Sequence, residues 1–140
     1  MKAFLDTNVL AAAFATRGLC SDLLREVLEN HELVTSLDIL AELKRILLTK
    51  FKIPAKQAEE ALDIIHSSSL VSAPSQEVEY DITDADDMPH LSAAEKAGCA
   101  VFVTGDKELW KISPVGNMLI CSPRDFWKMI SAEQSHATDG

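Results

Sequence analysis

Short apolar runs alternate with longer amphipathic stretches along the chain. The apolar runs cover residues 2–5, 32–35, 70–72, 100–103 and 118–121, and helix-like patterns cover 21–30, 36–48, 54–66, 87–98 and 123–130. Strands that alternate with helices in this way are typical of βα units around a parallel sheet. The pattern therefore predicts an α/β fold with a central, mainly parallel sheet.

One domain accounts for nearly the whole chain. The length of 140 residues and the 47% hydrophobic content suit a single core. We expect this domain to span residues 1–130 and to be followed by a flexible polar tail over 131–140. Residues 74–86 are acidic and rich in turn-forming residues, which predicts a loop before the helix that begins at Asp87.

The cysteines and the N-terminal segment limit the class of protein. Three widely spaced cysteines, Cys20, Cys99 and Cys121, suggest neither a disulfide framework nor a zinc cluster. The N-terminal residues reach Asp6 before an apolar stretch of signal-peptide length, and no run of eighteen apolar residues occurs. We expect a cytoplasmic protein that does not contact a membrane.

The net charge of −9, from 22 acidic and 13 basic residues, on its own argues against a nucleic-acid partner. That argument fails if several carboxylates hold divalent cations, because the bound metal cancels part of their charge. The charges are also segregated, with five basic residues in 44–56 and six acidic residues in 77–87. The positions of the acids therefore matter more than their number.

Four acids stand where a parallel sheet can gather them. Asp6 and Asp106 follow predicted strands, and the carboxyl ends of parallel strands line the crevice where ligands bind. Asp87 begins a predicted helix, and Glu42 lies at the edge of the apolar stripe of the helix over 36–48. Carboxylates without histidine or cysteine favour a hard cation, Mg²⁺ or Mn²⁺. Such ions most often serve phosphate chemistry.

The segments around these four acids resemble the PIN domain family, and within it the PIN-type toxins of prokaryotic toxin–antitoxin pairs (VapC-like ribonucleases). The matching segments are LDTNVL at 5–10, Ser36 through Glu42-Leu43, DADD at 84–87 with Ala97-Gly98, and VTGDK at 103–107. The resemblance implies a three-layer α/β/α sandwich. It also implies a metal-dependent endoribonuclease whose catalytic and metal-binding residues are Asp6, Glu42, Asp87 and Asp106, with Asp86 as the alternative to Asp87.

The implied reaction is hydrolysis of RNA by a water that one or two Mg²⁺ or Mn²⁺ ions activate. RNA is the implied substrate, an antitoxin protein the implied partner, and a homodimer the implied assembly, with Leu62, Ile65, Phe126 and Trp127 as candidate contacts. Replacing Asp6 or Asp106 by Asn is expected to abolish cleavage and to raise thermal stability without metal, because it relieves repulsion between carboxylates. A housekeeping PIN nuclease and a non-catalytic metal- or RNA-binding PIN module are the alternatives.

Further residues are candidates for supporting roles. Hydrogen bonds that orient the metal ligands are expected from Asn8 and Thr104, with Asp86 and Glu108 as accessory acids. Glu108 departs from relatives, which often carry Asp at that position. Possible RNA contacts are Arg17, Lys44, Arg45, Lys50, Lys52 and Lys107. The histidines, His31, His66, His90 and His136, show no ligand spacing and are expected on the surface or as satisfied core residues.

Overall fold

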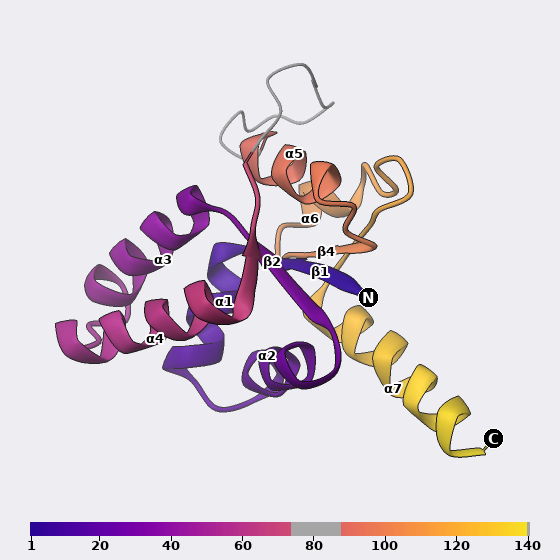
Figure 1. Cartoon of the computed structure of the whole chain (residues 1–140), viewed down its shortest axis with the longest axis horizontal. Coiled ribbons are helices and arrows are strands. Elements are labelled where there is room, and N and C mark those ends of the chain that lie inside the picture. Colours follow the sequence, from indigo (N-terminus) through magenta and orange to yellow (C-terminus); the bar gives the residue numbers. More distant parts are fainter. Residues whose placement is uncertain (74–87, 140) are drawn as a thin grey trace.

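The structure, a computed structural model, describes residues 1–73 and 88–139, with the side chains of 133–139 excepted. Its centre is an all-parallel sheet in the order β3-β2-β1-β4-β5 (Figure 1). The strands are β1 (Lys2–Leu5), β2 (Glu32–Thr35), β3 (Ser69–Val71), β4 (Val101–Val103) and β5 (Leu119–Cys121). The sequence-based prediction of an α/β fold with a parallel sheet is confirmed.

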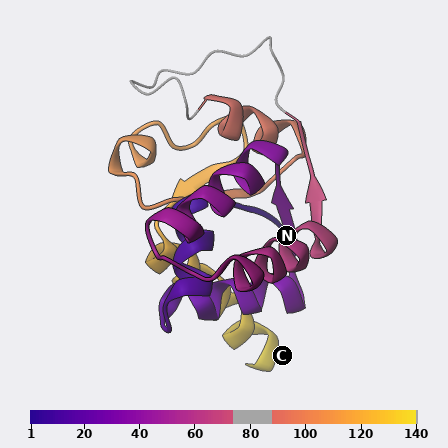
Figure 2. The same ribbon diagram turned by 90° about the vertical axis from the view of Figure 1, so that its left-hand side faces the viewer.

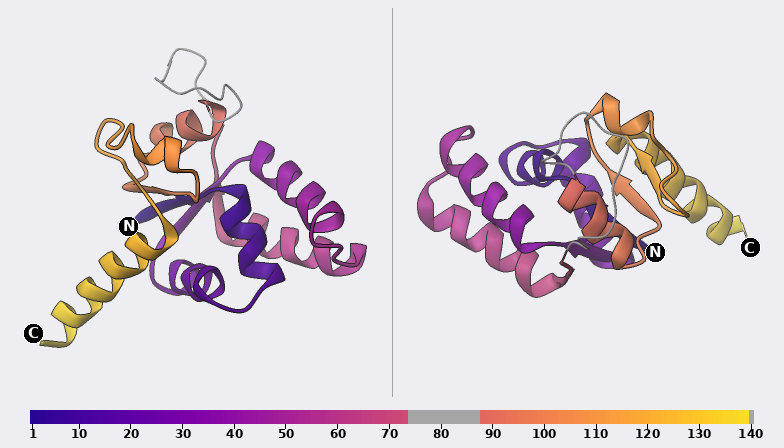
Figure 3. Two further views of the ribbon diagram at one scale, coloured as in Figure 1. Left: turned by 180° about the vertical axis from the view of Figure 1, so that it is seen from behind. Right: turned by 90° about the horizontal axis from the view of Figure 1, so that it is seen from above.

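Helices cover both faces of this sheet. They are α1 (Thr7–Ala15), α2 (Leu19–Asn30), α3 (Leu37–Thr49), α4 (Ala55–Ser68), α5 (Met88–Lys96), α6 (Lys107–Trp110) and α7 (Pro123–Asp139). Figure 2 shows α5 on one side of the sheet and α1 to α4 on the other. The far end of α7 extends beyond the body of the fold (Figure 3). The result is the expected three-layer sandwich.

The central strands β1, β2 and β4 are mostly apolar because both of their faces are covered. Phe4 of β1 and Phe102 of β4 are fully buried, and their rings stack with centroids 5.1 Å apart. Ser36 caps α3 by accepting a hydrogen bond from the Ile39 N–H at 3.2 Å. The core and this cap together hold β2 and α3 in place, and α3 carries Glu42.

Three elements differ from the sequence-based prediction. The helix α1 was not predicted, because its sequence TNVLAAAFA is apolar on nearly every side and shows no amphipathic period. The helix α6 has four residues, too few for any period to show. The last helix continues to Asp139, through the residues that we expected to form a flexible tail. The acidic loop of residues 74–86 and the helix start at Asp87 lie outside the described residues.

Two of the proposed dimer contacts are core residues. Ile65 and Phe126 are fully buried within the chain, so neither can form a contact between subunits. Leu62 and Trp127 are half-buried and pack against the same core. The prediction was wrong for Ile65 and Phe126 because an apolar helix face looks the same in sequence whether it packs inside or between chains. None of the described helices is long and apolar enough to cross a membrane.

Candidate active site

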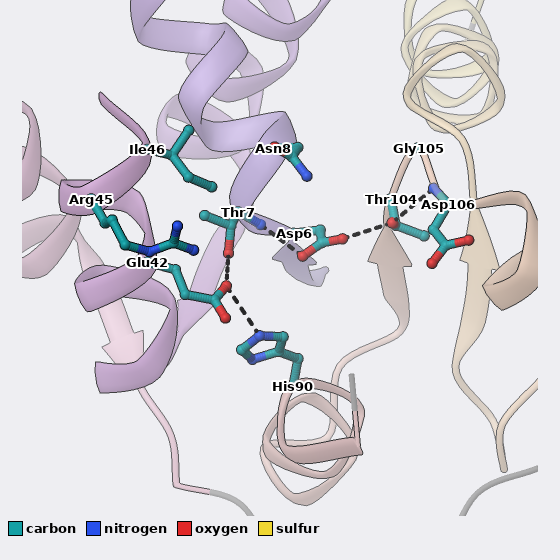
Figure 4. A pocket seen from close by; sticks show the side chains of 10 residues that line it. All are labelled: Asp6, Thr7, Asn8, Glu42, Arg45, Ile46, His90, Thr104, Gly105 and Asp106. Carbon is teal, nitrogen blue, oxygen red and sulfur yellow. Dashed lines mark hydrogen bonds and ion pairs between the residues drawn. The ribbon is translucent and has the colours of Figure 1, made fainter. Parts of the chain in front are cut away.

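An open cavity of about 580 Å³ lies where β1 and β4 end (Figure 4). Four segments bring polar side chains to it: the two strand ends, the middle of α3 and the start of α5. Its lining consists of Asp6, Thr7, Asn8, Glu42, Arg45, Ile46, His90, Thr104, Gly105 and Asp106. Three of the four predicted acids therefore share one cavity.

Asp6 is held by donors from two directions. Its Oδ1 accepts a hydrogen bond from the Thr7 N–H at 2.8 Å, which also begins α1, and its Oδ2 accepts one from the Thr104 hydroxyl at 2.8 Å. The Asp6 N–H itself donates to the Val103 carbonyl at 2.9 Å. Hydrogen bonds from two directions fix the orientation of a carboxylate. The side chain is thus locked between β1 and β4.

Glu42 reaches the cavity from α3 and is partly exposed. Its Oε2 accepts a hydrogen bond from the Thr7 hydroxyl at 2.7 Å and lies 3.3 Å from Nε2 of His90. Thr7 therefore contacts two of the acids, through its N–H to Asp6 and through its hydroxyl to Glu42. The buried threonine couples the two carboxylates across α1 and α3.

Asp106 begins α6 and is fixed through the turn that follows β4. Its Oδ1 accepts a hydrogen bond from the Glu108 N–H at 2.9 Å, and its own N–H donates to the Thr104 hydroxyl at 3.1 Å. The Trp110 indole N–H donates to the Thr104 carbonyl at 2.8 Å. Thr104 thus links Asp6 to Asp106, and the Trp110 side chain stabilises the turn through its hydrogen bond to the Thr104 carbonyl.

Comparison with known proteins identifies the family. A family model described as PIN domain matches residues 2–108. The chain belongs to the PIN domain family. A chain in the crystal structure of VapBC2 from Rickettsia felis bound to a DNA fragment from their promoter has a similar fold, with a TM-score of 0.62 and 18% sequence identity. The match covers 87% of this PIN domain and 98% of that chain. No curated protein sequence matches the chain.

PIN domains generally use divalent metal ions, and side chains of the kind that bind such ions line this cavity. Asp6, Glu42 and Asp106 supply carboxylate oxygens, the ligands that Mg²⁺ and Mn²⁺ prefer. In the described ranges, no three histidine, cysteine, aspartate or glutamate side chains lie close enough together to hold one ion. Asp87 and its alternative Asp86, which the family resemblance adds to the set, lie outside the described residues.

Two residues next to the acids do not play the parts expected of them. Asn8 lines the mouth of the cavity but is exposed, and it makes no hydrogen bond to a described acid. Glu108 touches Asp106 only through its backbone N–H, while its carboxylate pairs with the Lys111 ammonium at 3.0 Å on the surface. Because α6 turns the Glu108 side chain outward, an accessory metal-ligand role for that carboxylate finds no support in this arrangement.

Thr7 and His90 are the site residues that the sequence analysis missed. Thr7 stands between two matched motif residues, Asp6 and Asn8, and only the start of α1 turns it inward. His90 lies three residues from the predicted ligand Asp87 on the predicted helix, at the helical i,i+3 spacing. That spacing was a usable signal, but it pairs a histidine with an aspartate instead of with a second histidine or a cysteine.

The candidate RNA contacts are scattered. Arg45 lines the cavity, whereas Lys44 on the same helix pairs with Glu59 at 3.0 Å, and Lys107 is exposed outside the lining. Arg17 lies beyond the far end of α1, about 14 Å along the helix from its start at the cavity. Lys50 and Lys52 follow the end of α3, at least about 10 Å along its axis from Glu42. The structure therefore places Arg17, Lys50 and Lys52 outside the lining of the cavity, so we do not expect them to contact a phosphate bound within it.

Proposed function

We propose that this PIN domain is a metal-dependent endoribonuclease that hydrolyses RNA phosphodiester bonds. The observation that supports this activity best is the joint placement of Asp6, Glu42 and Asp106 in one open cavity at the carboxyl edge of the sheet. Each of these carboxylates accepts at least one hydrogen bond from a neighbouring residue. The described residues that line the cavity include oriented acids but no serine or cysteine, which suits hydrolysis that uses water.

The proposed metal ligands are Asp6, Glu42, Asp106 and Asp87, with Asp86 as the alternative to Asp87. When bound, Mg²⁺ or Mn²⁺ supplies the Lewis acidity that activates water and offsets the charge of the phosphate. The residues of the chain then have separate tasks. Thr7 and Thr104 keep the carboxylates in place, and the exposed Asn8 at the mouth can donate to a sugar or phosphate oxygen.

Arg45 is the cationic side chain among the residues that line the cavity. An arginine can bind a phosphate through two parallel hydrogen bonds, which suits a backbone contact next to the scissile bond. The cavity is open to solvent and its lining is mainly polar, as an extended, single-stranded or looped RNA requires. Because water attacks, we expect products with 5′-phosphate and 3′-hydroxyl ends.

The biological role that we propose is that of the toxin in a toxin–antitoxin pair, with an antitoxin protein as partner and a homodimer as the assembly. The PIN family membership and a fold shared with a chain of the VapBC2 structure support this role. A housekeeping nuclease would use the same cavity. Growth arrest on expression, reversed by a protein encoded beside the gene, distinguishes the toxin from the housekeeping enzyme.

The activity is tested by incubating purified protein with a mixed RNA pool and Mn²⁺. We expect cleavage that EDTA stops and that Asp106→Asn abolishes. Glu108→Gln is the matched control: it lies two residues away on the same turn and removes the same charge, but its carboxylate faces Lys111 instead of the cavity. Folded wild-type protein that leaves the pool intact with Mn²⁺, or equal loss of activity in both variants, would contradict the proposal.

A further inference from the structure

His90 is a buried histidine that reaches the cavity from the first turn of α5. Its side chain is 5% exposed, and its Nε2 lies 3.3 Å from Oε2 of Glu42 (Figure 4). A ring nitrogen this close to a carboxylate oxygen carries the hydrogen. The other ring nitrogen, Nδ1, is buried and has no hydrogen-bond partner among the described residues. One nitrogen of the ring therefore contacts Glu42, while the other has no partner in the part of the chain that the structure describes.

An unpaired buried nitrogen is costly, so this position needs an explanation beyond filling space. A leucine would fill the same space without leaving a polar atom unpaired. Three neighbours of His90 on α5, Leu91, Ala93 and Ala94, are fully buried apolar residues, so an apolar side chain would suit the packing of this helix. What the imidazole adds is its contact with Glu42.

Glu42 is a side chain that needs such a contact. It has three rotatable side-chain bonds, and its side chain is 37% exposed at the edge of α3. Its Oε2 is approached by two donors from two other helices, the Thr7 hydroxyl of α1 and the His90 ring of α5. No described residue donates a hydrogen bond to Oε1. The two donors thus restrain one oxygen and leave the other available within the cavity.

We propose that His90 is a positioning residue that holds Glu42 so that Oε1 is presented to a divalent cation. This inference rests on the metal site of the proposed function. It assigns α5, which lies on the opposite face of the sheet from α3, a direct part in shaping the site. Partners that orient metal ligands in this way change metal affinity by about 10- to 100-fold when they are removed.

The test measures Mn²⁺ binding by titration, with free Mn²⁺ followed by electron paramagnetic resonance. His90→Leu removes the donor and should weaken binding roughly tenfold. His90→Gln places an amide N–H near the position of Nε2 and should stay within about threefold of wild type. His66→Leu is the matched control, because His66 is an exposed histidine on α4. Circular dichroism and thermal melts without metal verify that each variant is folded.

A second measurement separates the effect of the contact between His90 and Glu42 from the effect of packing around His90. In metal-free protein, ¹⁵N–¹H NMR of the histidine rings should show hydrogen on Nε2 of His90, and Glu42→Gln should shift this resonance but not that of His66. Thr7→Val combined with His90→Leu should weaken Mn²⁺ binding by less than the product of the two single effects, since both donors restrain the same oxygen.

The outcomes separate this inference from the proposed function. Wild-type Mn²⁺ affinity in folded His90→Leu, or equal weakening in the Leu and Gln variants, overturns the positioning role while leaving the nuclease proposal intact. Protein that binds Mn²⁺ with the expected His90 dependence but cleaves no RNA overturns the nuclease proposal alone. Wild-type protein that binds no Mn²⁺ overturns both.

Discussion

Substitution of Asp6 by asparagine should lower the stability of the metal-free protein, although relief of repulsion between carboxylates argues for an increase. The carboxylate accepts two hydrogen bonds, from the Thr7 N–H and from the Thr104 hydroxyl, each at 2.8 Å. Asparagine keeps one acceptor for Thr7 but turns an N–H₂ group toward Thr104. The Thr104 hydroxyl must then accept from that group, and its own hydrogen loses its partner.

The size of the effect follows from these two bonds. A hydrogen bond to a charged group stabilises a protein by about 1 kcal/mol more than a neutral one, so two weakened bonds cost about 2 kcal/mol. Asp6 is only partly buried, and solvent screening reduces this cost to roughly 1 kcal/mol. For a chain of this length, that change in the free energy of unfolding lowers Tm by roughly 4 °C.

The assay is thermal unfolding in EDTA at low salt, with Asp106→Asn as the control. Asp106 acts as the N-cap of α6, a role that asparagine performs equally well, so this variant should melt within about 2 °C of wild type. A Tm for Asp6→Asn equal to or above that of wild type would show that repulsion between the acids outweighs the hydrogen bonds, and would refute the reasoning.

Three further predictions follow from other parts of the structure. In a catalytically inactive variant, Arg45→Gln should weaken RNA binding and reduce the slope of log affinity against log salt by roughly 0.7. Lys50→Gln in the same background should leave the slope unchanged, and equal slopes in both variants would place the RNA outside the cavity. Burial raises the pKa of Cys99 to about 12 and that of Cys121 to about 11 from 9.0, so both thiols should resist alkylation in folded protein at pH 8. Because the folded state keeps these protons longer than the unfolded state, stability to denaturant should fall as the pH rises from 9 toward 12, and a flat profile would contradict the burial.

Much of the architecture could be read from the sequence because the strands are buried on both faces. Residues such as Phe4 and Phe102 belong to short runs that are mostly apolar, and the polar residues after them mark where each strand ends. Parallel strands place these ends at one edge, which predicted that Asp6 and Asp106 lie together. The position of Glu42 depended on the family resemblance, because its place at the edge of a helix face is equally typical of a solvated acid.

Thr104 was expected to orient an acid and donates a hydrogen bond to Asp6, but the other supporting residues could not be predicted because their roles depend on side-chain direction. Thr7 and Asn8 are adjacent polar residues in one motif, and only the turn of α1 decides that Thr7 points inward and Asn8 outward. The same holds for Glu108, whose side chain α6 directs to Lys111. The basic residues at 44–56 are close in sequence, yet they lie on three different segments. Lys44 and Arg45 belong to α3, Lys50 and Lys52 follow its end, and Lys56 belongs to α4. Of these residues, Arg45 alone lines the cavity.

The order of the strands has a consequence for the chain during its synthesis. β1 is the middle strand, and it pairs on one side with β2, which follows soon in the sequence, and on the other with β4. The hydrogen bond between Thr104 and Asp6 spans 98 positions. A growing chain can therefore assemble β1, β2 and their helices early, while the cavity stays incomplete until β4 has emerged and paired. If the protein is the toxin that we propose, its nascent chain carries no assembled nuclease site for most of its translation.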